Sequence, residues 1–452
     1  MMEMLSVTAR RINAQLIGGD AAFQRVVTDT RQLRAGDLFV ALKGDNFDGH
    51  EFVQKAAEAG AVGALVSRQI SCALPQLLVQ DTLVGLQEFA ASWRRDFDLP
   101  VVAVTGSNGK TTTKQMLSAI FAARGPVLAT VGNLNNHIGL PLTLLSLRKE
   151  HRTAVIEMGA NHPGEIALLT RLTQPDIGLV TQAGDAHLEG FGSREGVARA
   201  KGELFAGLSS AGVAVINADD AYAGLWKELS VQKSVLTFGF AVNADVQARH
   251  AEVHADHCLF QLITPVGVQI VKLPLPGRHN ISNALGAAAC GVALGMDVEH
   301  IAEGLRRVEG ASGRVSWKTT PQGARLLDDS YNANPSSLHA GMELLAALPG
   351  ERWLVLGGMA ELGEGAARLH YEAGTAAKSL GINRLFALGD LAAEAAKAFG
   401  DGGAAYAEVE ALAQALRPGL NKNIALLVKG SRAARMERVV AELCEEKTIQ
   451  VH

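Results

Sequence analysis

The chain has 452 residues, of which 48% are hydrophobic and 19% charged, as expected for a folded protein of about three domains with a sizeable core. A formal net charge of −4, without any run rich in Lys and Arg, gives no support for nucleic-acid binding. There is no apolar stretch of about 18 residues that predicts a membrane span, and no apolar signal core at the N-terminus. The cysteines, Cys72, Cys258, Cys290 and Cys444, are far apart, so we expect no disulfide framework or zinc site and a cytoplasmic location.

Residues 1–84 form the first predicted domain, a small α/β unit. It holds the apolar run DLFVAL (37–42), the Ala-rich helical stretch HEFVQKAAEAG (50–60) and a second apolar run AVGALVS (61–67). Apolar runs that alternate with helical stretches are typical of α/β sheets.

Residues 85–313 form the second and largest predicted domain. Toward its end, this domain contains a β-like insert at 246–265 and a helical stretch at 280–295. Its strand candidates are apolar runs that end in polar or Gly-rich turns: PVVAVTG (100–106), TAVIEMG (153–159), DIGLVTQ (176–182) and GVAVINA (212–218). We expect a mostly parallel central sheet.

Residues 314–452 form the third predicted domain. Its helices include SSLHAGMELLAAL (336–348). They alternate with four apolar runs: ARLLDDS (324–330), RWLVLGG (352–358), NRLFALG (383–389) and IALLVKG (424–430). The whole chain is therefore predicted to be an α/β protein of three domains.

The motif VVAVTGSNGKTTT (101–113) joins an apolar run to a Gly-rich turn and then to a helix. The helix N-terminus presents backbone N–H groups to an anion, Lys110 adds charge for terminal phosphates, and the Thr111 hydroxyl suits Mg²⁺. Val104 replaces the usual first glycine, so the turn opens at Gly106. We predict that this loop binds nucleotide; the alternative is an ordinary Gly-rich turn with an exposed lysine.

The helix after the loop is amphipathic. Met116, Leu117, Ile120 and Phe121 fall on one face, which predicts that the helix packs on the sheet. The residues expected around the phosphates are Thr105, Gly106, Ser107, Asn108, Gly109, Lys110, Thr111 and Thr112.

The stretch TGSNGKTTTK (105–114) resembles the phosphate loop of the Mur ligases, ATP-dependent amide-forming enzymes of peptidoglycan precursor synthesis. The resemblance spans the chain through GNLNNHIGLPLTLL (132–145), AVIEMGANHPGEI (154–166), DAHLEGFGSREGVARAKGELF (185–205), LPGRHNISNA (275–284), LLDDSYNANPSSL (326–338), GGMAELG (357–363) and VKGSRAARME (428–437). It implies an N-terminal domain for a UDP-muramoyl substrate, a central ATP-binding domain of P-loop type and a C-terminal Rossmann-like ligase domain.

Within the family, TDTRQLRAGDLFVALKG (28–44) fits both the member that adds the third residue of the peptide and the member that adds D-alanyl-D-alanine. The D-N-P-R motif typical of the former does not occur, whereas DDSYNANP (328–335) and MAELG (359–363) resemble the latter. The resemblance therefore implies ligation of D-Ala-D-Ala to UDP-MurNAc-tripeptide through an acyl phosphate. The alternatives are the third-residue ligase, a folylpolyglutamate-synthase-like ligase and a regulatory P-loop protein that does not ligate.

Acyl-phosphate chemistry needs positive charge and precise positioning around the reacting groups. Glu157 ends an apolar run beside the phosphate loop, where its carboxylate suits Mg²⁺; the alternative is a solvated strand end. His187 follows the run at 176–182, and only the resemblance makes it a ligand of a second Mg²⁺, since Mg²⁺ favours oxygen.

Lys201 lies on a predicted helix on which Val197 and Leu204 share its face. An ordinary lysine there would extend its ammonium to solvent. In the family the matching lysine is carbamylated and becomes an anionic Mg²⁺ ligand. The resemblance thus implies four catalytic residues, Lys110, Glu157, His187 and Lys201, and four metal ligands, Thr111, Glu157, His187 and Lys201.

The resemblance places the rest of the nucleotide on residues of two domains. Asn280 and Asn283, three residues apart on a helix, are assigned to adenine, although Asn280 also suits a helix cap. Arg314 is assigned to the phosphates and Asp329 to the ribose, so the third domain must close over the second. The hinge reads ASGR (311–314), where Pro-Gly-Arg is more usual.

Substrate contacts are expected from all three domains. We expect Asp29, Thr30 and Arg31 to contact UDP, although polar turns of this kind are usually only turns. The muramoyl peptide is expected at Asn133, Asn135 and Asn136, and the dipeptide and phosphate side at Tyr331, Asn332, Asn334, Lys429, Ser431 and Arg432. We expect a monomer.

Overall fold

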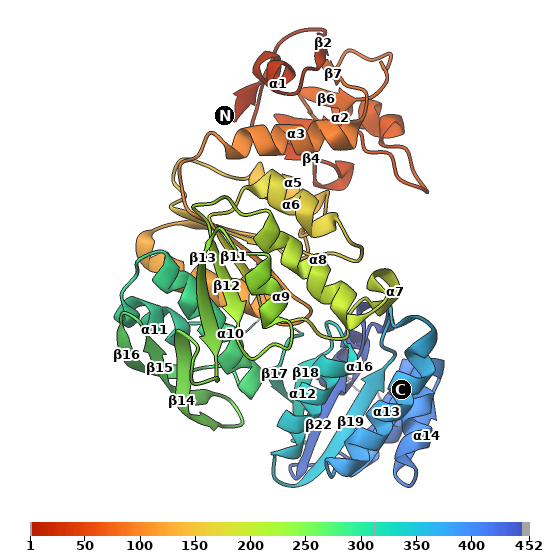
Figure 1. The fold of residues 1–452 in the computed structure, drawn as a ribbon. Helices are drawn as coiled ribbons and strands as arrows, with labels where there is room; N and C mark the ends of the chain where they lie inside the picture. The colour runs from red at the N-terminus through yellow and green to blue at the C-terminus, as the bar shows by residue number, and fades with distance from the viewer. Residues whose placement is uncertain (1, 311–312, 445–452) are drawn as a thin grey trace.

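The computed structural model describes residues 2–310 and 313–444. Its three large sheets belong to three α/β units that follow one another along the chain (Figure 1). In that view the N-terminal unit lies at the top, the central unit below it and the C-terminal unit at the lower right. The predicted α/β fold of three domains is confirmed. Among the described residues, no helix combines the length and apolar character that crossing a bilayer requires.

The N-terminal unit holds a five-stranded and a two-stranded sheet. Its elements are β1 (Glu3–Met4), α1 (Leu5–Arg11), β2 (Gln15–Ile17), β3 (Ala22–Phe23), β4 (Arg25–Val27), η1 (Thr30–Gln32), β5 (Asp37–Val40), η2 (Gly49–Phe52), α2 (Val53–Glu58), β6 (Gly63–Val66) and β7 (Gln76–Leu78). The larger sheet has the order β2-β7-β6-β5-β4, and only the edge strand β2 is antiparallel. The two predicted apolar runs form β5 and β6, which are buried throughout.

Helix α3 (Thr82–Arg94) joins the N-terminal unit to the central one. Its residues Leu86, Phe89 and Trp93 belong to a hydrophobic cluster that continues from the N-terminal sheet into the central unit. The two units therefore share one apolar layer. The division that we predicted between residues 84 and 85 falls inside this helix, and both domain boundaries stay proposals.

The central unit carries a nine-stranded sheet. Its elements are β8 (Val101–Thr105), α4 (Lys110–Phe121), η3 (Ala122–Arg124), β9 (Val127–Ala129), α5 (Gly139–Leu144), β10 (Thr153–Glu157), α6 (Glu165–Thr173), β11 (Ile177–Val180), α7 (Leu188–Phe191), α8 (Arg194–Ala206), β12 (Val213–Asn217), α9 (Ala223–Glu228), β13 (Ser234–Gly239), β14 (Val246–Val253), β15 (Cys258–Thr264), β16 (Gly267–Leu273), α10 (Arg278–Ala293) and α11 (Val298–Arg306). The order is β16-β15-β14-β13-β12-β11-β8-β10-β9. All neighbours are parallel except β14 with β15 and β15 with β16, which form the predicted β-like insert.

Helices cover both faces of this sheet because its strands are apolar on both sides. Val102 and Val104 of β8 pack in the cluster that holds the residues of α4, α10 and α11. Val101 and Ala103 face the opposite cluster, which holds α6 and α8. The chain continues from β8 to the edge strand β9 and then returns to β10 and β11, which lie on either side of β8. The carboxyl end of β8 is therefore a topological switch point. Open α/β sheets bind their ligands at such points.

The C-terminal unit is a second mostly parallel sheet with its own core. Its elements are β17 (Ser316–Thr319), β18 (Arg325–Asp329), α12 (Pro335–Ala346), β19 (Glu351–Gly357), η4 (Gly363–Gly365), α13 (Ala366–Ser379), β20 (Arg384–Leu388), α14 (Asp390–Phe399), β21 (Gly403–Tyr406), α15 (Val409–Leu416), η5 (Arg417–Gly419), β22 (Ile424–Lys429), η6 (Arg432–Ala434) and α16 (Glu437–Cys444). The order is β17-β18-β22-β19-β20-β21, with only β17 antiparallel. One core cluster packs α12, α13 and α14 on the sheet, and another packs α15 and α16 on its other face.

Helix α11 presses directly on the backbone of α4, the helix that follows the phosphate loop. A Cβ added to Gly304 would lie 2.5 Å from the Cα of Ile120, which is too close for two carbon atoms that are not bonded to each other. We expect Gly304→Ala to lower the free energy of unfolding by about 1–3 kcal/mol through overpacking. Urea unfolding measures this change.

Gly224→Ala is the matched control, because Gly224 lies in helix α9 with open space around its Cα. It should stabilise the protein by up to about 1 kcal/mol through helix propensity. Equal stability of the two variants would contradict the close contact between α11 and α4.

Candidate active site

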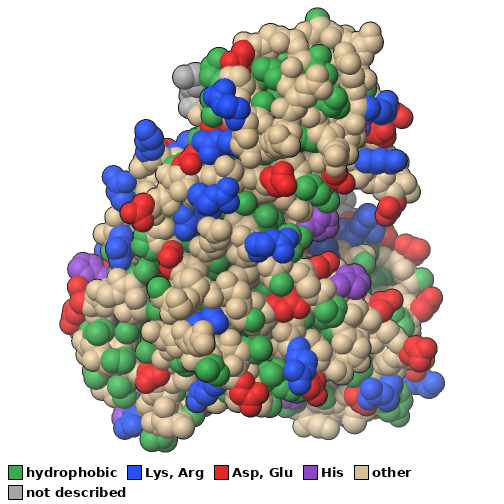
Figure 2. Space-filling view, turned by 45° about the horizontal axis from the view of Figure 1, so that its top comes forward, with side chains coloured by type: hydrophobic (Ala, Val, Ile, Leu, Met, Phe, Trp, Pro, Cys, Tyr) green, Lys and Arg blue, Asp and Glu red, His purple; other side chains and the backbone are tan. Residues whose placement is uncertain are grey.

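A cavity of about 680 Å³ opens where the central and C-terminal units meet. The space-filling view shows a recess between the units on the right, with Lys, Arg and His side chains on its walls (Figure 2). The predicted site residues that line the cavity are Ser107, Asn108, Gly109, Lys110, Thr111, Thr112, Asn133, Asn135, Asn136, Glu157, His187, Asn280, Asn283, Arg314, Asp329, Tyr331, Asn332, Asn334, Lys429 and Arg432. Those outside its lining are Asp29, Thr30, Arg31, Thr105, Gly106, Lys201 and Ser431.

The phosphate loop depends on two glycines that a larger residue cannot replace. Gly109, with φ of 81°, caps α4, and a Cβ there would lie 2.3 Å from Oδ1 of Asn283. A Cβ on Gly106 would lie 1.9 Å from Oγ1 of Thr181. Val104 is still inside β8 and buried, which explains why no glycine is needed there.

Glu157 is the carboxylate at the centre of the site and is only 2% exposed. Oγ1 of Thr111 donates to it at 3.0 Å, Nδ2 of Asn135 donates at 2.9 Å, and Nζ of Lys114 lies 3.2 Å away. Burial opposes ionisation, but the charges of Lys114 and Lys110 outweigh it and hold the pKa of Glu157 below its usual value. The side chain is therefore a carboxylate at neutral pH.

Lys114 is a site residue that our sequence reasoning missed. It lies four residues after Lys110, hence on the same helical face, and it is buried against Glu157. The motif TGSNGKTTTK contained this signal as its final lysine. Lys110 itself folds back, and its Nζ donates to the carbonyl oxygen of Gly106 at 2.7 Å.

His187 comes just before α7 and has a left-handed backbone, with φ of 54°. Its Nδ1 lies in ion-pair contact with Oε2 of Glu361 in the C-terminal unit, but makes no hydrogen bond of good geometry. Burial lowers the pKa of His187, and the charges of Lys110 and Lys201 add to this effect, against the opposing influence of Glu361. Glu361 lies in the motif MAELG (359–363), and the sequence alone assigned it no role.

Lys201 lies on α8 and is 1% exposed, which excludes the alternative of an ordinary lysine that extends its ammonium to solvent. Its Nζ donates to the carbonyl oxygen of Ala160 at 3.3 Å and lies 5.2 Å from the centre of the Phe191 ring. Burial lowers the pKa of Lys201 to about 7, with the charge of Lys110 contributing. Ala160 lines the cavity, so Lys201 stands immediately behind its wall.

The two predicted adenine residues share one hydrogen-bonded arrangement. Nδ2 of Asn283 donates to Oδ1 of Asn280 at 3.2 Å, and Nδ2 of Asn280 donates to the carbonyl oxygen of Pro276 at 2.7 Å. Helix α10 begins at Arg278 after Gly277, so Asn280 is inside the helix and its interpretation as a cap is wrong. The neighbouring His279, which we missed, lines the cavity, and burial lowers its pKa.

The C-terminal unit contributes two paired cations. The guanidinium of Arg314 stacks on the ring of Tyr331, 4.1 Å from its centre. Lys429 forms an ion pair with Asp329 and donates to the carbonyl oxygen of Asn332 at 3.0 Å. We had assigned Asp329 and Lys429 to different substrates, whereas the fold pairs them with each other. Of the hinge at 311–314, residues 311–312 lie outside the described residues.

The phosphate loop touches the C-terminal unit directly. Nδ2 of Asn334 donates to Oδ1 of Asn108 at 2.8 Å, and Nδ2 of Asn108 donates to Oγ of Ser336 at 3.0 Å. Asn334 is also the N-cap of α12, in a capping box with Ser337. One polar contact therefore connects the start of a helix in one unit to the phosphate loop of another.

Other predicted substrate residues serve local structure. Oδ1 of Asn136 accepts from the backbone N–H of Gly139 at 2.8 Å, at the start of α5. Asp29 caps η1 and pairs with the exposed Arg31. Ser431 is buried, and its backbone N–H donates to the carbonyl oxygen of Gly358. Each of these contacts is made within the chain, so a role of Asn136, Asp29, Arg31 or Ser431 in substrate binding stays a prediction.

Charged side chains of both signs line the cavity, and the acidic ones are Glu157, Glu165, Asp329 and Glu343. Lys110, Arg314, Lys429 and Arg432 line it. Among the described residues, no group of three or more His, Cys, Asp and Glu side chains is placed to hold a metal ion by itself. A phosphate loop at a sheet switch point, facing cations of a second α/β unit, defines a nucleotide-binding protein whose site is shared between two units.

Comparison with known proteins gives the family. Residues 23–94, 104–291 and 313–432 match three families described as "Mur ligase family, catalytic domain", "Mur ligase middle domain" and "Mur ligase, glutamate ligase domain". The chain is 45% identical to the UDP-N-acetylmuramoyl-tripeptide–D-alanyl-D-alanine ligase of Escherichia coli (strain K12), over 98% of this chain and 100% of that one. This chain belongs to the Mur ligase family.

Two solved structures resemble this fold closely. MurF from Acinetobacter baumannii superposes with a TM-score of 0.93 at 35% identity, over 98% of this chain and 100% of that one. MurF ligase from Thermotoga maritima, in complex with ADP, superposes with a TM-score of 0.82 at 28% identity, over 93% of this chain and 97% of that one. Both likenesses extend over all three units.

The buried ammonium of Lys201 predicts a pH-dependent stability. Because the pKa falls from 10.5 to about 7 on folding, the unfolded chain binds more protons between these values. The unfolding free energy of the wild type should therefore rise with pH across this window. Lys201→Met should be the more stable protein at about pH 7 and lose that advantage toward about pH 10.

Urea unfolding at several pH values, in buffer stripped of CO₂ so that the amine stays free, measures the difference. Lys227→Met, at an exposed position of α9, is the control and should show no such dependence. A constant difference between wild type and Lys201→Met over the whole window would show that Lys201 does not titrate there.

Proposed function

We propose that this chain joins D-alanyl-D-alanine to UDP-N-acetylmuramoyl-tripeptide with hydrolysis of ATP to ADP and phosphate. The observation that carries this function is the full-length identity of 45% with a ligase named for that reaction. The two-unit cavity with its phosphate loop supports it. The enzyme acts in peptidoglycan precursor synthesis as a monomer in the cytoplasm, where ATP and UDP-linked precursors are found.

ATP binds with its phosphates at the N-terminus of α4. There, backbone N–H groups and Lys110 meet the negative charge, and Arg314 approaches from the other unit. Transfer of the γ-phosphoryl group to the substrate carboxylate gives an acyl phosphate, and the amine of the dipeptide then displaces phosphate. The fixed positive groups stabilise the charge that develops on the transferred phosphoryl oxygens. Binding of ADP by the Thermotoga maritima relative supports this placement.

The residues around Glu157 also fit Mg²⁺. A buried carboxylate with the Thr111 hydroxyl 3.0 Å away provides the hard oxygen donors that this ion prefers. His187 lines the same cavity as Glu157 and Thr111. When bound, Mg²⁺ supplies positive charge that neutralises the phosphates. Glu157 and Thr111 would hold one ion, and His187 would hold a second.

The remaining predicted residues divide between nucleotide and substrates. Asn280 and Asn283 bind adenine, and Asp329 binds the ribose, oriented by Lys429. Asn133, Asn135 and Asn136 meet the muramoyl peptide, while Asp29, Thr30 and Arg31 receive the UDP end. The dipeptide side is formed by Tyr331, Asn332 and Arg432. Asn334 acts indirectly, because it is hydrogen-bonded to Asn108 of the phosphate loop. Ser431 also acts indirectly, because it lies outside the cavity.

We also propose that Lys201 works as a carbamate. Its lowered pKa leaves an appreciable fraction of neutral amine near pH 7, and that amine can react with CO₂ to form an anionic carbamate. Lys201 stands beside the wall residue Ala160, close enough to His187 for its charge to lower the pKa of that ring. A carbamate oxygen there adds a hard donor for Mg²⁺, whereas an ammonium would repel it.

Phosphate release from ATP tests the function. It should require both UDP-MurNAc-tripeptide and D-Ala-D-Ala, and Lys110→Ala should slow it about a hundredfold, on the order of 3 kcal/mol of transition-state stabilisation. Lys149→Ala, at an exposed lysine of the same unit, is the control. Equal turnover with the UDP-muramoyl dipeptide and a lone diamino acid would instead identify the third-residue ligase. Turnover that is independent of both substrates would identify a regulatory ATPase.

Removal of CO₂ tests the carbamate. Wild-type enzyme in CO₂-free buffer should lose activity and regain it with bicarbonate. Lys201→Ala should respond to a short-chain carboxylic acid, which can replace the anionic oxygens. Full activity without CO₂, together with rescue of Lys201→Ala by a small amine alone, would show instead that Lys201 acts as a cation.

A further inference from the structure

The contact between His187 and Glu361 is the place where the C-terminal unit reaches the metal side of the site. Glu361 belongs to the loop at residues 358–365, between β19 and α13, and His187 belongs to the loop that precedes α7. The backbone N–H of Glu189 donates to the carbonyl oxygen of Glu361 at 3.3 Å. The two loops are thus joined by a side-chain contact and a backbone hydrogen bond.

Both partners have strained backbones. His187 has φ of 54° and Glu361 has φ of 60°, in the left-handed region that residues other than glycine rarely adopt. Such strain persists only where the surroundings impose it, and it gathers at functional sites. Two strained residues that meet across a boundary between units indicate that this contact is selected for its geometry.

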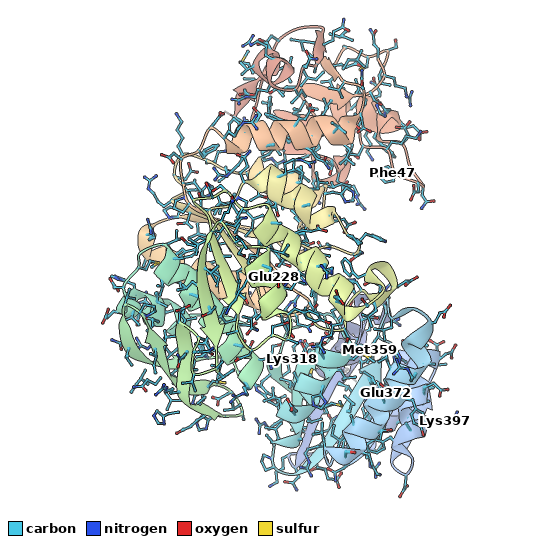
Figure 3. All side chains as sticks on the ribbon, in the orientation of Figure 1. Phe47, Glu228, Lys318, Met359, Glu372 and Lys397 are labelled. Atoms are coloured by element: carbon cyan, nitrogen blue, oxygen red, sulfur yellow. The ribbon has the colours of Figure 1, made fainter. Side chains whose placement is uncertain are left out.

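The loop that carries Glu361 is held firmly within its own unit. Met359 is buried, and its backbone N–H donates to Nε2 of the buried His370 at 2.9 Å. Leu362 is buried as well. Figure 3 labels Met359 at the edge of the C-terminal unit that faces α7. Glu361 therefore moves with the C-terminal unit as a rigid part of it.

We propose that Glu361 is a positioning residue for His187, supplied by the C-terminal unit when it closes on the central one. With Nδ1 held by the carboxylate, the ring orientation is set and Nε2 is the nitrogen left to bind. Carboxylates commonly orient metal-binding histidines in this way. Closure of the C-terminal unit then completes the reaction centre. Phosphoryl transfer therefore requires the closed arrangement, in which the same unit also brings Arg314 and the dipeptide residues to the site.

This inference rests on the proposed ligase function and adds a residue to it. Glu361 is about half exposed, so its contact with His187 contributes little to stability. Its effect on the reaction is to orient the ring of His187. The contact at Asn108 and Asn334 holds the same two units together at the phosphate loop. Glu361 therefore has a separable role, and its loss leaves the other contact in place.

A double-mutant cycle tests the coupling. Glu361→Gln should lower kcat about tenfold, the effect usual for partners of metal-binding histidines, and leave KM for ATP and for D-Ala-D-Ala within about twofold. In a His187→Ala background, Glu361→Gln should have no further effect. Glu361→Gly, which relieves the backbone strain, should be as slow as Glu361→Gln. Additive effects, or full activity of Glu361→Gly, would overturn the proposal.

Glu364→Gln is the matched control, an exposed carboxylate of the same loop, and should have wild-type kcat. Ligation by the wild-type protein is measured first in the same assay. If the wild type does not ligate, the proposed function is rejected, and the role of Glu361 is then tested by a second measurement. That measurement is disulfide trapping, which needs no turnover. A Cβ on Gly363 would lie 3.9 Å from Cβ of Glu189, within the range of a disulfide.

The double variant Glu189→Cys/Gly363→Cys should form this crosslink under oxidation, and each single variant should not. Adding Glu361→Gln should slow the formation of this crosslink about two- to fivefold, the size of effect expected when a part-exposed polar contact is weakened. The strain that a cysteine meets at residue 363 is common to both backgrounds, so it cancels in the comparison. An unchanged crosslinking rate would show that Glu361 does not favour the closed contact.

Discussion

The structure of the site depends on one buried carboxylate, Glu157, which interacts with two lysines of the same helix. Lys110 and Lys114 lie on one face of α4, both influence Glu157, and Lys201 is buried nearby. Burying ammonium groups is unfavourable unless anions compensate for them, and Glu157 alone does not balance Lys110 and Lys114. A triphosphate and a substrate carboxylate supply the missing negative charge.

The three units are joined by two different kinds of contact. The N-terminal and central units share a continuous apolar core through α3, which resists separation because opening it would expose that core to water. The C-terminal unit has core clusters of its own, and Ala255 of the central unit packs against one of them. It also meets the central unit through polar contacts, such as Asn108 with Asn334 and His187 with Glu361. Polar contacts can exchange with water, so the C-terminal unit is the one suited to open and close.

Much of the fold was predictable because apolar runs and glycine-rich turns are local signals. The runs at 101–105, 153–157 and 177–180 are strands buried on both faces, and their carboxyl ends carry the phosphate loop, Glu157 and the loop of His187. Strand order could not be predicted, since nothing local in β9 tells that it lies at the edge of the sheet. The prediction that Asn280 caps a helix was wrong because Gly277, three residues earlier, already occupies the cap position.

The sequence alone determined the chemistry of the phosphate loop, because a strand, a tight turn and a helix bring Gly109, Lys110 and Thr111 together without help from elsewhere. Only the tertiary structure decided which charges face each other. Lys114 with Glu157, Lys429 with Asp329 and Glu361 with His187 are each more than 40 residues apart in the chain. Such pairs depend on how sheets stack and units close, and a contact between distant residues leaves no periodic or local pattern in one sequence.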